Sequence, residues 1–160
     1  MTVSKISPCL WFVGEAEEAA RFYVSLLPDS RINRVQKSPV DTPGGKAGSV
    51  LIVDFTLAGQ TFLALNGGTP LERNNSVSFS VDCADQAEVD RLWSALAADG
   101  EEIVCGWVKD RYGFSWQIVP SILPKMIADP DPVKAARAMQ AMMGMVKLDI
   151  AALQRAYDGA

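Results

Sequence analysis

The residues of this sequence that could do chemistry gather in one stretch, residues 105–120. Cys105 is a candidate nucleophile or acid, and Lys109 and Asp110 follow closely enough to adjust the charge of its thiol. Gln117 lies in a segment that alternates polar and apolar residues, as a half-buried strand does. Its amide therefore either lines a binding surface, faces solvent or is satisfied in the core. Cys105 has a simpler interpretation too, as a small buried apolar residue.

The sequence contains no histidine. Histidine is the commonest ligand of transition metals and the usual base near neutral pH, so a histidine-dependent triad and a histidine zinc site are excluded. The three cysteines, Cys9, Cys83 and Cys105, lie far apart in the chain. This sparse, odd count excludes a disulfide scaffold or a zinc finger and indicates a reducing compartment.

Composition predicts a globular protein. Apolar residues make up 49% of the 160 positions and charged residues 21%. The net charge of −4 argues against a nucleic-acid partner. No apolar run reaches the roughly 18 residues of a membrane span, and the N-terminus lacks the pattern of a signal peptide. We therefore expect a cytoplasmic protein with no membrane partner.

Periodicity predicts the same order of elements twice. The first half has a strand at 6–13, a helix at 15–27 and strands at 31–37, 49–57 and 60–65. A loop rich in proline and glycine, of the kind that often covers a cleft, separates the middle two strands.

The second half repeats this order with a strand at 76–81, a helix that begins at the Asp85–Glu88 capping box, and strands at 102–108 and 114–119. We predict an α+β fold of paired βαβββ modules that form a curved mixed sheet. Residues 1–122 make the domain, with module one at about 5–68 and module two at about 74–120. Residues 123–160 form a helical C-terminal extension whose methionine cluster either packs on the domain, seals a dimer or docks a partner.

Five blocks of sequence in order carry a resemblance to a known family: 6–12, 17–23, 65–68, 85–90 and 105–120. Together they resemble the PhnB-like family, often labelled demethylubiquinone methyltransferase-like. That family belongs to the vicinal oxygen chelate superfamily of glyoxalase and bleomycin-resistance proteins. The resemblance implies a sheet curved around a cavity, usually completed in a homodimer, and in metal-dependent relatives four side chains that hold one divalent ion.

The positions that match those ligands do not suit a metal. Pro8 stands at the first, Leu63 or Ala64 with Asn66 nearby at the second, Ser76 where histidine is usual, and Gln117 where glutamate is usual. Proline has no side-chain donor, and neutral serine and glutamine are poor ligands for these metals. We therefore predict no metal and no other cofactor.

The methyltransferase label is not supported by the residues. A Rossmann-type methyltransferase has a glycine-rich turn between a strand and a helix. The two glycine pairs, at 44–45 and 67–68, do not sit at such a junction. Whether the protein is an enzyme stays open at this point.

Alternation along the strands, aligned on the family, predicts a cavity with apolar walls and a few neutral polar groups. Such a lining suits a small, partly apolar organic molecule. The predicted ligand-binding residues are Phe12, Asn66, Ser76, Ser78, Trp107 and Gln117, with Leu10, Ser80 and Ser115 on the same concave face and Cys105 as the one candidate for catalysis.

Three functions are open. The first is a metal-free protein that binds this molecule. The second is an enzyme of the vicinal oxygen chelate type, a lyase, dioxygenase or transferase, with an atypical site at Cys105. The third is a structural or partner-binding homodimer whose methionine-rich extension docks a second protein.

Overall fold

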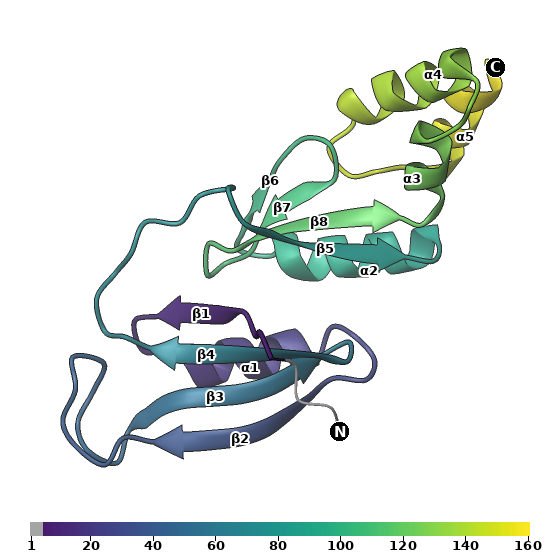
Figure 1. Ribbon diagram of the computed structural model, residues 1–160. Coiled ribbons are helices and arrows are strands. Elements are labelled where there is room, and N and C mark those ends of the chain that lie inside the picture. The colour runs from purple at the N-terminus through teal and green to yellow at the C-terminus, as the bar shows by residue number, and fades with distance from the viewer. Residues whose placement is uncertain (1–4) are drawn as a thin grey trace. The chain divides into compact units, whose positions relative to one another are not determined.

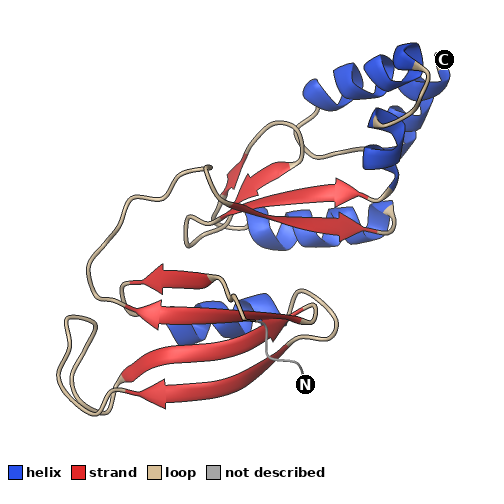
Figure 2. Cartoon of the chain, in the orientation of Figure 1, coloured by secondary structure: helices blue, strands red, loops and turns tan. Residues whose placement is uncertain are grey.

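The computed structural model describes residues 5–160. The chain divides into two compact units, the first ending at Glu72 and the second running from Arg73 to Ala160. Figure 1 shows the two units, and Figure 2 shows that each has one helix against one face of a sheet. No helix in residues 5–160 has the length and apolar character needed to cross a membrane.

Unit one has the predicted βαβββ order. Its elements are β1 (Cys9–Phe12), α1 (Ala16–Val24), β2 (Arg31–Lys37), β3 (Val50–Leu57) and β4 (Gln60–Asn66). The sheet order is β1-β4-β3-β2, with β1 parallel to β4 and the other pairs antiparallel.

The core of unit one lies between α1 and the sheet. Small residues on one face of α1, Ala16 and Ala20 among them, are fully buried and bring the helix close to the strands. Tyr23 stacks on Phe55 with 6.3 Å between ring centroids, and Phe55 stacks on Phe62 at 5.4 Å. Aromatic pairs at such distances add to the burial energy of the core.

Unit two repeats the topology, which confirms the predicted duplication. Its elements are β5 (Ser78–Cys83), α2 (Gln86–Ala97), β6 (Glu101–Glu102), β7 (Trp107–Lys109) and β8 (Ser115–Pro120). The sheet order is β5-β8-β7-β6, with β5 parallel to β8.

Helix α2 starts at the predicted cap. Asp85 Oδ1 accepts a hydrogen bond from the backbone N–H of Glu88 at 2.9 Å. The Glu88 carboxylate accepts a hydrogen bond from the backbone N–H of Ala84 at 2.8 Å. In the usual capping box this donor is the N–H of the cap residue itself, one position later. Buried Leu92 and Trp93 on α2 belong to the same core as Trp116 on β8.

The predicted strand at 102–108 is interrupted. Cys105 has φ +62° and Gly106 has φ +79°, so the chain turns there and pairs again only from Trp107. A left-handed conformation at a residue other than glycine costs energy and has no simple signature in sequence. The result is two short strands, β6 and β7, in place of one.

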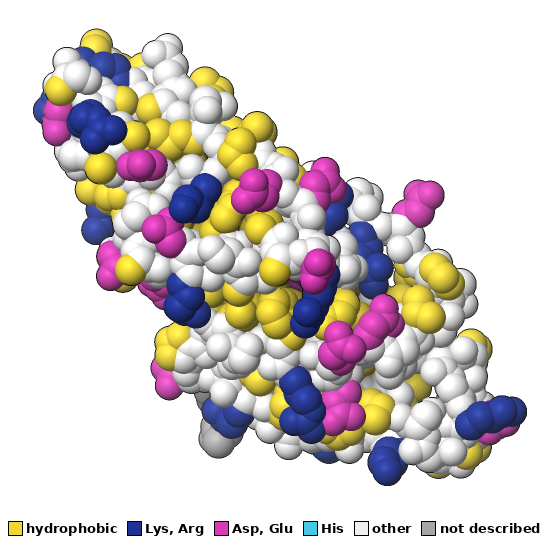
Figure 3. Space-filling view, turned by 180° about the vertical axis from the view of Figure 1, so that it is seen from behind, with side chains coloured by type: hydrophobic (Ala, Val, Ile, Leu, Met, Phe, Trp, Pro, Cys, Tyr) yellow, Lys and Arg dark blue, Asp and Glu magenta, His cyan; other side chains and the backbone are white. Residues whose placement is uncertain are grey.

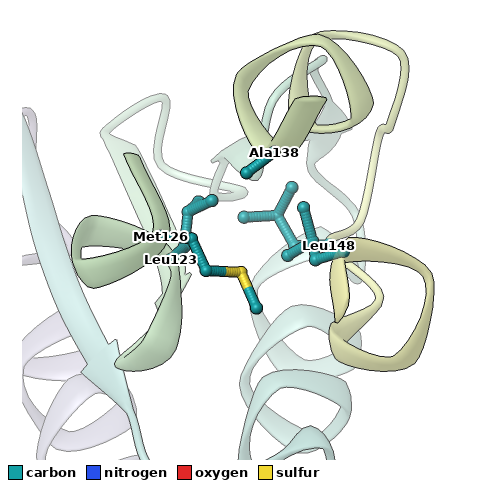
Figure 4. Close-up of a cluster of buried hydrophobic side chains, with 5 residues drawn as sticks. Leu123, Met126, Ala138 and Leu148 are labelled. Atoms are coloured by element: carbon teal, nitrogen blue, oxygen red, sulfur yellow. The ribbon is translucent and has the colours of Figure 1, made fainter. Parts of the chain in front are cut away.

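The C-terminal extension is the part of the chain after β8, residues 121–160. It contains α3 (Ile122–Ile127), α4 (Pro132–Met143) and α5 (Ile150–Asp158). Figure 4 shows Leu123, Met126, Ala138 and Leu148 pointing toward one another, and these residues with Leu153 form a buried cluster. The extension is therefore a folded part of unit two with a core of its own.

Candidate functional site

The face of the β5–β8–β7 sheet opposite α2 carries Ser78, Trp107 and Gln117. Trp107 on β7 is directly paired with Gln117 on β8, so the two side chains lie next to each other. Gln117 Nε2 donates to Ser78 Oγ on β5 at 2.9 Å. Trp116 and Ile118, which alternate with Gln117, are buried on the other face. This alternation agrees with the strand pattern predicted from the sequence.

A pocket of about 440 Å³ lies between this face and the first helices of the extension. The sheet side contributes Cys105, Trp107, Gln117 and Val119, and the extension contributes Leu123, Pro124, Ile127, Ala128 and Met142. None of these nine side chains carries a formal charge. The pocket can therefore take an apolar molecule with a neutral polar group.

Cys105 lies at the edge of this pocket and also lines a smaller hollow of about 260 Å³ next to Asn75, Ile103, Val104 and Trp107. Its backbone N–H donates to Met145 O at 2.7 Å. Its thiol is half-buried and approaches the carbonyl of Met143 at 4.0 Å, the long limit of a sulfur contact.

The two charged residues near Cys105 in sequence have other partners. Lys109 Nζ pairs with Glu101 at 3.2 Å. Asp110 is buried and accepts hydrogen bonds from Trp116 Nε1 at 2.8 Å and from the N–H groups of Tyr112 and Phe114. Its carboxylate holds the turn and the core tryptophan in place.

Other predicted site residues have structural contacts. Phe12 in unit one is fully buried and pairs with Asn66 across β1 and β4. Asn66 Oδ1 accepts from the N–H of Ala16 at the start of α1, and its Nδ2 donates to Val50 O. Both side chains thus lie on the α1 side of their sheet, and their predicted contact with a ligand stays a prediction.

The predicted serines are distributed differently. Ser76 precedes β5, is exposed and bonds to Asn74, because the strand starts two residues later than predicted. Ser115 is buried and donates to Asn75 at 2.6 Å. Of the predicted polar lining, the structure brings Ser78, Trp107 and Gln117 together with Cys105.

The residues that sequence reasoning missed are those of the extension. Met142 lies 22 positions after the end of β8, and nothing in local periodicity specifies that it faces the same pocket as the strands. The methionine cluster is the one signal in the sequence, and it leaves packing on the domain, sealing a dimer and docking a partner as alternatives.

The positions matching metal ligands in the resemblance do not assemble a donor set. Among residues 5–160, no three Cys, Asp or Glu side chains are grouped so that they could hold a metal ion. The carboxamide of Gln117 and the hydroxyl of Ser78 are neutral donors already bonded to each other. The residues present therefore do not fit a divalent ion of that kind.

Burial raises the pKa of two of the cysteine thiols. Burial, with the neighbouring carboxylates of Glu88 and Asp82, raises the pKa of Cys83 to about 12. Partial burial also raises the pKa of the Cys9 thiol, although that residue is exposed overall. Cys83 is therefore chemically inert at neutral pH.

Figure 3 shows Lys and Arg side chains interspersed with Asp and Glu side chains on the side of each unit that faces the viewer.

Comparisons with known proteins add the following. The sequence model of a family described as 3-demethylubiquinone-9 3-methyltransferase matches residues 4–119. A PhnB protein from Bacillus cereus is 33% identical, with a TM-score of 0.67, covering 73% of this chain and 99% of its own. Protein PA1353 from Pseudomonas aeruginosa, 22% identical with a TM-score of 0.60, covers 72% of this chain and 96% of its own and shows a similar fold. No curated protein matches.

Proposed function

The chain belongs to the 3-demethylubiquinone-9 3-methyltransferase family, and on that premise we propose that it binds a small, partly apolar organic molecule without a metal ion. The site is the pocket of unit two. The single observation that carries the proposal is the lining of this pocket, in which Trp107 and Gln117 stand among apolar side chains and no charged group is present. A charged ligand would lose its hydration there without gaining a counter-charge.

The methyl transfer named in the family description is not what we propose. Gly67 and Gly68 follow β4 and lead into a loop, and Gly44 and Gly45 lie in the loop before β3. Neither pair joins a strand to a helix, which is where a Rossmann-type enzyme binds its nucleoside cofactor. The two sheets are mixed, with an antiparallel majority, and not doubly wound.

The proposal is tested by titration with Nile red, a neutral dye whose emission rises in apolar surroundings. We expect saturable binding of one dye per chain that is unchanged by EDTA. Gln117→Trp fills the pocket from the sheet side and is expected to abolish binding. Ser94→Trp is the matched control, because Ser94 is an exposed residue of α2 that does not line the pocket.

Circular dichroism and thermal unfolding of both variants establish that they are folded. Equal dye binding by Gln117→Trp and wild type would show that the dye sits elsewhere and would count against the pocket. Binding that EDTA removes would count against a metal-free site.

A further inference from the structure

We propose that the C-terminal extension is the wall that selects the ligand, and that the ligand is a neutral molecule with an unbranched apolar chain and one hydroxyl or primary amide head group. This inference rests on the proposed function, since it names the ligand class of the same pocket. It rests on two observations. Two neighbouring side chains on the sheet side of the pocket have polar groups without a hydrogen-bond partner among residues 5–160, and the residues on the opposite side all belong to the extension.

The sheet side of the pocket offers one hydrogen-bond donor and one acceptor. The indole N–H of Trp107 has no acceptor among residues 5–160. Gln117 uses its Nε2 on Ser78, and no group in the same range donates to its Oε1. Because Trp107 and Gln117 are directly paired, the two free groups belong to neighbouring side chains. A hydroxyl or a primary amide both accepts and donates, so one such group satisfies the two residues.

The opposite side of the pocket is apolar and comes entirely from the extension. Leu123, Pro124, Ile127 and Ala128 of the α3 region and Met142 of α4 form it. The family match ends at residue 119, before any of these residues. The wall thus lies outside the matched part of the chain, and in this proposal it determines how long an apolar chain can enter.

Backbone and side-chain contacts hold the segment that follows the wall. The N–H groups of Cys105 and Gly106 donate to the carbonyls of Met145 and Val146 at 2.7 and 2.8 Å. On α2, Gln86 donates to Leu148 O at 3.1 Å and accepts from Ile150 N at 2.8 Å. Met142 of the wall lies three residues before this segment, so the end of α4 is tied to the rest of unit two.

The experiment is displacement of Nile red by primary alcohols from butanol to dodecanol. We expect affinity to rise about fourfold with each methylene up to a limiting length and then to stop rising, since one buried methylene contributes about 0.8 kcal/mol. The alkane of the same length as the best alcohol is expected to bind about tenfold more weakly, because it leaves both polar groups unpaired. The matching carboxylate is expected to bind more weakly than the alcohol as well.

Two matched variants test the wall. Ala128 is exposed and lines the pocket, so Ala128→Phe adds bulk to the wall with little risk to folding and is expected to shorten the limiting length. Ala136→Phe places the same ring at an exposed position of α4 outside the pocket and is expected to leave the length unchanged. Thermal unfolding of both variants checks that the extension is intact.

The outcomes separate the two proposals. A limiting length that is the same in Ala128→Phe and wild type, or alkanes that bind as well as alcohols, overturns this inference. If Gln117→Trp still abolishes dye binding in that case, the proposed function stands. Failure of the wild-type protein to bind dye overturns both.

Discussion

Gln117 on β8 is hydrogen-bonded to Ser78 on β5, with 2.9 Å between Nε2 and Oγ. This bond fixes the orientation of the neutral amide of Gln117. It also spans the two strands that are parallel in the second sheet. The pair therefore defines the polar side of the pocket without introducing a charge.

Replacing Ser78 tests this orienting role. Ser78→Ala is expected to weaken alcohol binding several-fold while lowering the free energy of unfolding by about 1 kcal/mol, the net value of one hydrogen bond. Ser80→Ala, on the same strand and outside the pocket, is expected to change neither. The measurements are dye displacement and urea denaturation, and equal alcohol affinity of the two variants would contradict the role.

Gly106, directly before β7, lies in close contact with the extension. A Cβ there would lie 2.9 Å from Leu148 Cδ1 and 3.0 Å from Ile118 O, at φ +79°. Gly106→Ala is expected to lower the free energy of unfolding by about 2–4 kcal/mol, since strain and overpacking add.

Gly48→Ala is the control for Gly106→Ala. Gly48 has φ +86° but nothing within 4 Å of its Cβ position, so this substitution incurs the backbone strain alone, about 1–2 kcal/mol. Urea denaturation of both variants gives the difference between them. No difference would mean that the extension does not press against Gly106.

Asp110 is predicted to be essential for stability. Asp110→Ala leaves the buried Trp116 indole N–H and two backbone N–H groups of the turn without their acceptor. We expect a loss of about 2–4 kcal/mol, and a loss below 0.5 kcal/mol would contradict this assignment. Asp82→Ala, at an exposed position of β5, is the control and is expected to be close to neutral.

The three thiols are expected to react at different rates. At pH 8, Cys9 and Cys105 should react with a disulfide reagent in the folded protein, and Cys83 only after unfolding, because it is buried with a pKa of about 12. Rapid reaction of three thiols in the folded state would contradict the buried environment of Cys83.

The same group gives a pH dependence. A thiol whose pKa is higher in the folded state contributes stability that is complete below its unfolded value of about 9 and declines as the pH rises toward 12. Cys83→Ala should reduce this alkaline loss, as measured by urea denaturation between pH 8 and pH 11. An unchanged slope in the variant would assign the alkaline loss to other groups.

Much of the fold could be predicted from sequence because both units follow local rules. The alternation around Gln117 and the Asp85 cap are each specified by a few adjacent residues, and both are present in the structure. The break at Cys105 was not predictable, since a left-handed cysteine is fixed by its backbone bond to Met145, 40 positions away.

The site was predicted only in part. Alternation assigned Trp107, Gln117 and Ser78 to accessible positions, but it does not say which face of a sheet a helix will cover. Phe12 and Asn66 therefore turn out to lie on the α1 side of the first sheet. The wall formed by Ala128 and Met142 depends on long-range packing of the extension, for which sequence periodicity gives no partner.

The most direct test of the central claim is the metal and ligand content of the protein, purified without a histidine tag or chelator. Plasma mass spectrometry is expected to find no stoichiometric zinc, nickel, manganese or iron, and native mass spectrometry should find one neutral alcohol bound per chain after its addition. One equivalent of metal per chain that is lost in Gln117→Leu would contradict the account and assign the pocket to metal-dependent chemistry.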